Sequence, residues 1–189
     1  HAIIRRLPAE VTVDAILRAT ASDAKAATFH STMQGRKIGM HPVSIQTRSI
    51  DYSLLVFGKP LRTTNCDCER QLQPTLLQSL YVRNDHELIE WLERKDGWLA
   101  QLAKTLGQSL VSDLKPRTET EPPDAGEAPA PERLDELIQA AYLRTQNRSP
   151  SADELSRARS HIAETESTVE GLRDLMWALL NTQEFLTNH

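Results

Sequence analysis

The chain has 189 residues, of which 39% are hydrophobic and 25% are charged, a composition that is ordinary for a globular protein. Its formal net charge is −4 at pH 7, and its arginines are scattered between acidic residues, whereas nucleic-acid binding requires a clustered basic surface. No run of about 18 apolar residues is present, so we expect no membrane-spanning helix.

Helical periodicity begins in the stretch "RLPAEVTVDAILRAT". Pro8 stands near the start of a predicted helix, where its missing N–H costs nothing. Val13, Ile16, Leu17 and Thr20 fall on one face of that helix. We expect an irregular segment near residues 21–50, in which a weak alternation of apolar residues indicates at most a short strand or an extended loop.

The stretch "DYSLLVFG" predicts one or two helical turns that end at Gly58, and Pro60 prevents their continuation. After a loop, "QPTLLQSLYVRN" has the apolar stripe of an amphipathic helix. The positions of that stripe are Leu76, Leu77, Leu80 and Tyr81.

The next helical stretch begins near Asn84, which can form a capping box with Glu87, and it ends at Gly107, a natural C-cap. Its apolar positions fall on two faces. One face holds Leu88, Trp91 and Leu92, and the other holds Trp98, Leu99, Leu102 and Leu106. We expect Trp91, Trp98 and, further along, Trp177 to pack in the core.

Residues 111–131 are rich in proline and glutamate and hold no large apolar residue after Leu114, so we predict a mobile linker or long loop there. This divides the chain into an N-terminal helical lobe, residues 1–110, and a C-terminal lobe of three helices, residues 132–189, that packs on the first. The predicted fold class is mainly α, a bundle of about seven helices in one body or two lobes.

The C-terminal lobe carries two clear signals. Ser151 and Glu154 have the spacing of a capping box ahead of a helix. The ending "LMWALLNTQEFLTNH" has a continuous apolar stripe, and Phe185 can fold back onto it. We predict that this ending packs into the core through Leu175, Met176, Leu179, Leu180 and Phe185.

Both cysteines of the chain lie in "NCDCER", as Cys66 and Cys68. The spacing is too short for covalent haem attachment, and Glu69 stands where that motif has histidine. A zinc site would need two further ligands, which could come from the histidines at positions 30, 41 and 86. A local disulfide is feasible but strained, since neighbours two apart in an extended chain are at the upper limit of the distance for a bridge.

The remaining interpretation is two reduced thiols packed in an ordered loop, with no metal or haem attached. In this interpretation Arg70 pairs with a carboxylate and Glu69 accepts backbone N–H bonds. We therefore take Cys66, Asp67, Cys68, Glu69 and Arg70 as a structural or functional loop.

No other pattern indicates catalysis. The histidines lack the helical spacing of a metal hydrolase. Asp85, His86 and Glu87 are consecutive and would point in different directions from a helix, so we expect them to complement its N-terminal dipole. The serines have no nucleophile-elbow context. We assign no catalytic residue, no metal ligand and no cofactor.

Taken together, several blocks resemble the planctomycete-specific domain one family, a C-terminal domain of unknown function. These blocks are "RRLPAE", "FGKPLRTTNCDCER", "PTLLQSLYVRN", "LIQAAYLRTQNRSPSADEL" and "LMWALLNTQEFLTNH". The family pattern has Arg-Pro-Pro-like residues where this chain has "RSP", and Gly-Arg-Pro where it has "GKP". The chain retains the family's "CDCER", which favours a structural or functional role for Glu69 and Arg70.

The resemblance implies context more than mechanism. Such domains typically end large exported proteins, behind another domain and often with a c-type cytochrome domain. We therefore expect a non-catalytic docking module of an exported, periplasmic or cell-surface protein, with upstream domains of the same polypeptide or a c-type cytochrome as partner. The alternatives are an enzyme component in polysaccharide or sulfate-ester metabolism with a cleft at the cysteine loop, and a small thiol redox or metal module.

Overall fold

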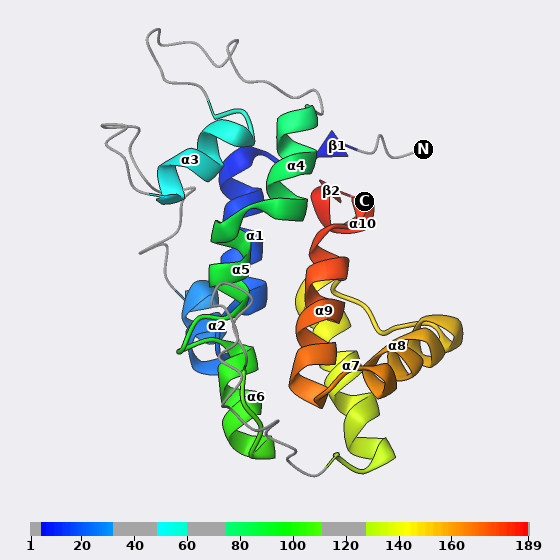
Figure 1. The fold of residues 1–189 in the computed structure, drawn as a ribbon. Coiled ribbons are helices and arrows are strands. Elements are labelled where there is room, and N and C mark those ends of the chain that lie inside the picture. Colours follow the sequence, from blue (N-terminus) through cyan, green and yellow to red (C-terminus); the bar gives the residue numbers. More distant parts are fainter. Residues whose placement is uncertain (1–4, 32–48, 60–74, 111–127, 189) are drawn as a thin grey trace, which may run out of the picture.

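Figure 1 shows a computed structural model of the chain, which describes residues 5–31, 49–59, 75–110 and 128–188. The described residues form ten helices and one sheet of two short strands, so the mainly α class is confirmed. The helices are α1 Ala9–Thr20, α2 Asp23–Ser31, α3 Ser49–Val56, α4 Leu76–Asn84, α5 His86–Leu92, α6 Trp98–Leu106, α7 Pro131–Thr145, α8 Ala152–Glu164, α9 Thr168–Leu180 and α10 Gln183–Leu186. The strands are β1 Arg5–Arg6 and β2 Thr187–Asn188.

Helix α1 lies at the centre of the N-terminal half and contacts α2, α3, α5 and α7. Its predicted inner face is confirmed, because Val13, Ile16 and Thr20 are buried. Helices α7, α8 and α9 pack on one another, and α9 also contacts α5 and α6 (Figure 1). One hydrophobic core therefore includes side chains from both halves of the chain.

The predicted lobe boundary falls largely on residues 111–127, which lie outside the described part of the chain. Residues 128–130 precede α7, and Pro131 is the first residue of that helix. Proline suits this position because its missing N–H is not needed in the first helical turn. The division into two lobes and the mobility of the linker stay predictions.

The C-terminal apolar stripe packs into the core as predicted. Helix α9 presents it inward, and Thr182 then caps α10 by accepting a hydrogen bond from Phe185 N at 3.2 Å, which turns the chain back. The buried members are Leu175, Met176, Leu179, Leu180 and Phe185. Strand β2 follows directly and pairs antiparallel with β1, so the two ends of the described chain lie side by side.

Three predicted helix ends are present. Ser151 and Glu154 form the capping box of α8, with Ser151 N 2.7 Å from Glu154 Oε2 and Glu154 N 3.3 Å from Ser151 Oγ. Gly107 is the C-cap of α6 in the left-handed conformation, at φ 62°. Gly58 follows α3 with φ 90°, a backbone conformation that glycine adopts without steric cost.

Two local differences from the prediction have simple causes. Helix α2 occupies residues 23–31, part of the segment predicted to be irregular. Its alanines favour a helix, but it lacks the apolar stripe on which the prediction relied. The cap of α5 is Asp85, whose side chain accepts from Glu87 N at 2.9 Å, because Asn84 is the last residue of α4.

The predicted stripe on α4 is wrong for its first two members. Leu76 is 76% exposed and Leu77 is 51% exposed, whereas Gln78 and Tyr81 are buried. Gln78 can face inward because it completes the capping box with Thr75 and accepts a hydrogen bond from Arg6. Its amide oxygen is thus satisfied away from water.

The tryptophan prediction is confirmed for Trp91 and Trp98, which are buried. Trp177 is 36% exposed, so the expectation of core packing is wrong for that residue. Position 177 lies between the two buried pairs of α9, 175–176 and 179–180, on the side of the helix that solvent reaches.

Candidate functional site

The site residues predicted from the sequence, Cys66, Asp67, Cys68, Glu69 and Arg70, lie outside the described residues. The state of the thiols and the pairing of Arg70 therefore stay predictions. The described chain stops at residue 59, shortly after α3, and resumes at residue 75, just before α4. These two helices contact each other, so the described region next to the predicted loop is the α3 and α4 pair.

An apolar surface lies on this pair. Tyr52 and Leu55 on α3 are 48% and 38% exposed, and Leu76 and Leu77 on α4 are more exposed still. We call these four side chains the α3–α4 apolar face. They are four of the six large hydrophobic side chains that are exposed among the described residues; the others are Leu143 and Trp177.

The α3–α4 apolar face rests on buried aromatic residues. The ring of Tyr52 lies 6.0 Å from that of Tyr81, and the ring of Phe57 meets Tyr81 edge-on at 5.5 Å. Tyr81 is one helical turn from Leu77, since side chains four apart on a helix lie on the same side. The exposed residues of α3 and α4 thus stand on two helices that contact each other through Tyr81.

Beneath this surface, Tyr81 donates a hydrogen bond to Glu87 Oε2. Both residues are buried, as is Ser53. Burial, followed by the hydrogen bond to Glu87, raises the pKa of the Tyr81 phenol far above its usual range, and a hydrogen bond with Ser53 acts in the opposite direction. The phenol stays protonated, so this contact joins α4 to α5 as a structural hydrogen bond.

The consecutive acidic and histidine residues at the start of α5 do not converge on one site. Asp85 caps the helix, Glu87 is buried against Tyr81, and His86 is exposed with Nδ1 3.2 Å from Glu90 Oε1. The prediction that they point in different directions is confirmed. His86 is also the only described side chain among the histidines considered for a zinc site, and it faces solvent.

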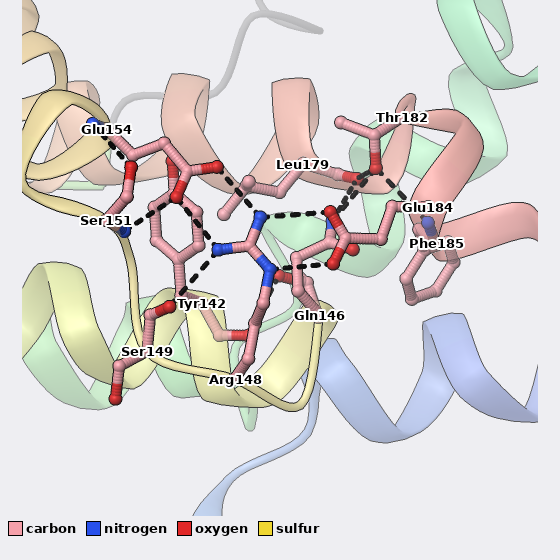
Figure 2. Close-up of polar contacts among 11 residues, drawn as sticks. Tyr142, Gln146, Arg148, Ser149, Ser151, Glu154, Leu179, Thr182, Glu184 and Phe185 are labelled. Carbon is pink, nitrogen blue, oxygen red and sulfur yellow. Dashed lines mark hydrogen bonds and ion pairs between the residues drawn. The ribbon is translucent and has the colours of Figure 1, made fainter. Parts of the chain in front are cut away.

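A dense polar cluster surrounds Arg148, between the α7–α8 loop and α10 (Figure 2). Arg148 Nη1 and Nη2 each lie 2.8 Å from an oxygen of Glu154. Arg148 Nε and Nη2 lie 2.7 and 2.9 Å from the two oxygens of Glu184. We call these three residues the Arg148 clamp, because one guanidinium holds two carboxylates in bidentate geometry.

The electrostatics of the Arg148 clamp are those of a structural ion pair. The hydrogen bonds from Arg148 lower the pKa of Glu154 to about 2, and the backbone N–H of Ser151 adds to this effect. The same carboxylates raise the pKa of Arg148. A general acid needs the opposite shift, a raised pKa near the working pH. The contribution of Glu154 to the free energy of unfolding is therefore fully present above the pKa that Glu154 has in the unfolded chain. It is lost as the pH falls towards about 2, the pKa of Glu154 in the folded chain.

Neighbouring residues extend the clamp. Gln146 Nε2 donates to Leu179 O at 3.0 Å and to Thr182 Oγ1 at 2.9 Å (Figure 2). The guanidinium of Arg148 also lies 5.6 Å from the centre of the Tyr142 ring. Arg148 was not among the site residues predicted from the sequence, although it stands just before the capping box of α8. Its partner on α10 is 36 positions away and had no sequence signal.

A second cluster lies between α5 and α9. Arg173 is 7% exposed and faces three carboxylates. Its Nη1 lies 3.5 Å from Glu93 Oε1, and its Nη2 lies 3.2 Å from Asp174 Oδ1 and 3.9 Å from Glu170 Oε1. This cluster ties the end of α5 to α9.

Two further properties hold for the described residues. They contain no group of three or more histidine, cysteine, aspartate or glutamate side chains placed to bind a metal ion. None of their helices combines the length and the apolar character needed to cross a membrane.

Comparison with known proteins places the chain in a family. A family model named PSD1, described as a protein of unknown function (DUF1553), matches residues 1–162. The chain belongs to this family. No curated protein and no solved structure matches it. The PSD1 match includes the cysteine loop, and the resemblance seen in the sequence is thereby confirmed, while the apolar ending of α9 and α10 lies beyond the matched residues.

Proposed function

We propose that this PSD1 chain is a non-catalytic docking module whose α3–α4 apolar face packs against the upstream part of its own polypeptide. The observation that carries the proposal is the exposure of Tyr52, Leu55, Leu76 and Leu77 on two adjacent helices. Exposed apolar side chains grouped in this way favour burial against another protein surface. The resemblance to exported multidomain proteins supports the same context.

The size of the face favours a partner on the same polypeptide. Four partly exposed side chains offer on the order of a few hundred Å² of apolar surface. A stable complex of two separate proteins buries about 800 Å² on each partner. A covalent link raises the effective concentration of a neighbouring domain to the millimolar range, so a smaller face suffices.

The position of β1 agrees with such a neighbour. Arg6 of β1 donates a hydrogen bond to Gln78 on α4, next to Leu76 and Leu77 (Figure 1 shows β1 beside α4). A polypeptide that leads into β1 therefore arrives beside the first turn of α4, which carries Leu76 and Leu77. A neighbouring domain attached there needs only a short linker to reach it.

The polar clusters support a structural role over catalysis. Glu154 has a lowered pKa and is held by Arg148, and Glu87 is buried against Tyr81. In each case the carboxylate accepts a hydrogen bond from a neighbouring side chain. The enzyme and thiol alternatives both depend on the cysteine loop, whose residues lie outside the described part.

The test is to replace Leu76 and Leu77 together by glutamine in the longer polypeptide that this proposal assumes, which we call the long polypeptide. We expect the radius of gyration from small-angle scattering to increase, because the docked neighbour is released. In the 189-residue chain alone, the same change should alter the free energy of unfolding by less than about 0.5 kcal/mol per site, since both side chains are exposed.

The matched control is Leu143→Gln, which changes a leucine on α7 that is 49% exposed and lies outside the face. The control should leave the scattering curve of the long polypeptide unchanged. Identical curves for the face variant and the unsubstituted protein would refute docking through this face. An extended unsubstituted polypeptide that binds a separate c-type cytochrome would instead assign the face to a partner in another chain.

A further inference from the structure

We propose that the Arg148 clamp sets the position of α4, and with it the α3–α4 apolar face, through α10, β2 and β1. The structural coupling from Arg148 to α4 does not depend on the proposed function. Only its consequence for docking rests on the proposed function. Every contact along the route is a hydrogen bond, an ion pair or a direct chain connection.

The first step fixes α10. This helix has only four residues, and a helix of that length has little stability of its own. Its Glu184 is held by two contacts from Arg148, at 2.7 and 2.9 Å, and its N-cap Thr182 accepts from Gln146 at 2.9 Å. The α7–α8 loop, which supplies Arg148, thus holds α10 in place (Figure 2).

The second step passes from α10 to β1. Strand β2 continues directly from α10 and pairs with β1, with Arg6 opposite Thr187. Leu7 N also donates to Leu186 O at 3.1 Å. A pair of two-residue strands is marginal in isolation, so β1 remains paired only while α10 holds β2 in position.

The third step reaches the docking face. Arg6 Nη1 donates to Gln78 Oε1, and Gln78 is 2% exposed within the capping box of α4. The first turn of α4 carries Leu76 and Leu77. Loss of the strand pairing would move Arg6 and remove one of the contacts that hold this turn, so the capping-box hydrogen bond from Gln78 N to Thr75 would open more often.

The test compares Glu184→Gln with Asp135→Asn in the 189-residue chain by amide hydrogen exchange. Glu184→Gln preserves the shape of the side chain and removes its charge from the Arg148 clamp. Asp135→Asn does the same to the contact between Arg159 and Asp135, where Nε and Oδ1 are 2.6 Å apart. That contact joins α8 to α7 and does not involve α10.

We expect Glu184→Gln to speed exchange at the Leu7 and Gln78 amides by about tenfold, as opening of the strand pair becomes easier. Asp135→Asn should leave both rates unchanged. Equal rates at Leu7 in the two variants overturn the proposal. Faster exchange in α10 without any change at Leu7 or Gln78 overturns it as well, because the route is then broken after its first step.

A second variant guards against a general loss of stability. Arg148→Lys keeps the positive charge but cannot contact both carboxylates in bidentate fashion. It should speed exchange at the same amides while the protection of α1 is unchanged, and a uniform increase over the whole chain contradicts the proposal. If Glu184→Gln alters the Gln78 amide while the scattering of the long polypeptide is unchanged, the coupling stands and its link to docking fails.

Discussion

Truncation of the chain after Leu172 is expected to abolish cooperative folding. The deletion removes five buried large side chains of α9 and α10: Leu175, Met176, Leu179, Leu180 and Phe185. Loss of one such side chain costs about 2–5 kcal/mol, and a whole domain is stable by only about 5–15 kcal/mol. Thermal unfolding followed by circular dichroism should therefore show no sigmoidal transition.

The control for this truncation is a chain that ends after Leu186. It keeps every buried residue of α9 and α10 and loses only β2 and the final residue. It should retain a sigmoidal transition at a lower midpoint, because the pairing with β1 is lost. A transition of unchanged midpoint in the chain that ends at Leu172 would show that the C-terminal stripe contributes nothing to the core.

Replacement of Arg173 by methionine is expected to lower the free energy of unfolding by about 3 kcal/mol. Arg173 is buried, and its Nη1 faces Glu93, whose side chain is 6% exposed. Methionine fills much of the volume but removes the positive charge beside a buried carboxylate. Denaturant unfolding of the variant gives this difference directly.

The double variant with Glu93→Gln should recover part of the lost stability, because the carboxylate that depends on Arg173 is then neutral. The coupling energy follows from the two single variants and the double variant. Arg133→Met is a matched control, since Arg133 forms a contact of 2.7 Å with Glu136 in which both side chains are more than half exposed. It should cost less than about 1 kcal/mol. Equal losses of unfolding free energy in the Arg133 and Arg173 variants would show that the buried contact between Arg173 and Glu93 adds no more stability than an exposed ion pair.

The parts of the fold that followed from the sequence are those with local causes. The stripe of α9 is a spacing of three and four residues, and the capping box of α8 lies within four positions, so each can be seen in a short window. Helix α2 has no such stripe. It forms through its alanines, which give a helix no preferred face to detect.

The features that escaped prediction depend on residues distant in the chain. Gln78 turns inward, and Leu76 outward, because Arg6 supplies a donor from 72 positions away. The Arg148 clamp likewise requires Glu184 from α10. Hydrophobic periodicity predicts that leucine is buried in preference to glutamine. It cannot detect a polar partner that only the tertiary fold brings near.

The most direct test of docking through the α3–α4 apolar face is hydroxyl-radical footprinting of Tyr52, Leu76 and Leu77. Labelling rates are compared between the 189-residue chain and the longer polypeptide in which the proposed function places it, with the exposed Leu143 as internal reference. We expect the three residues to react several times more slowly in the long polypeptide, while Leu143 reacts at the same rate in both. Equal rates at Tyr52, Leu76 and Leu77 in the two proteins would contradict the proposed function.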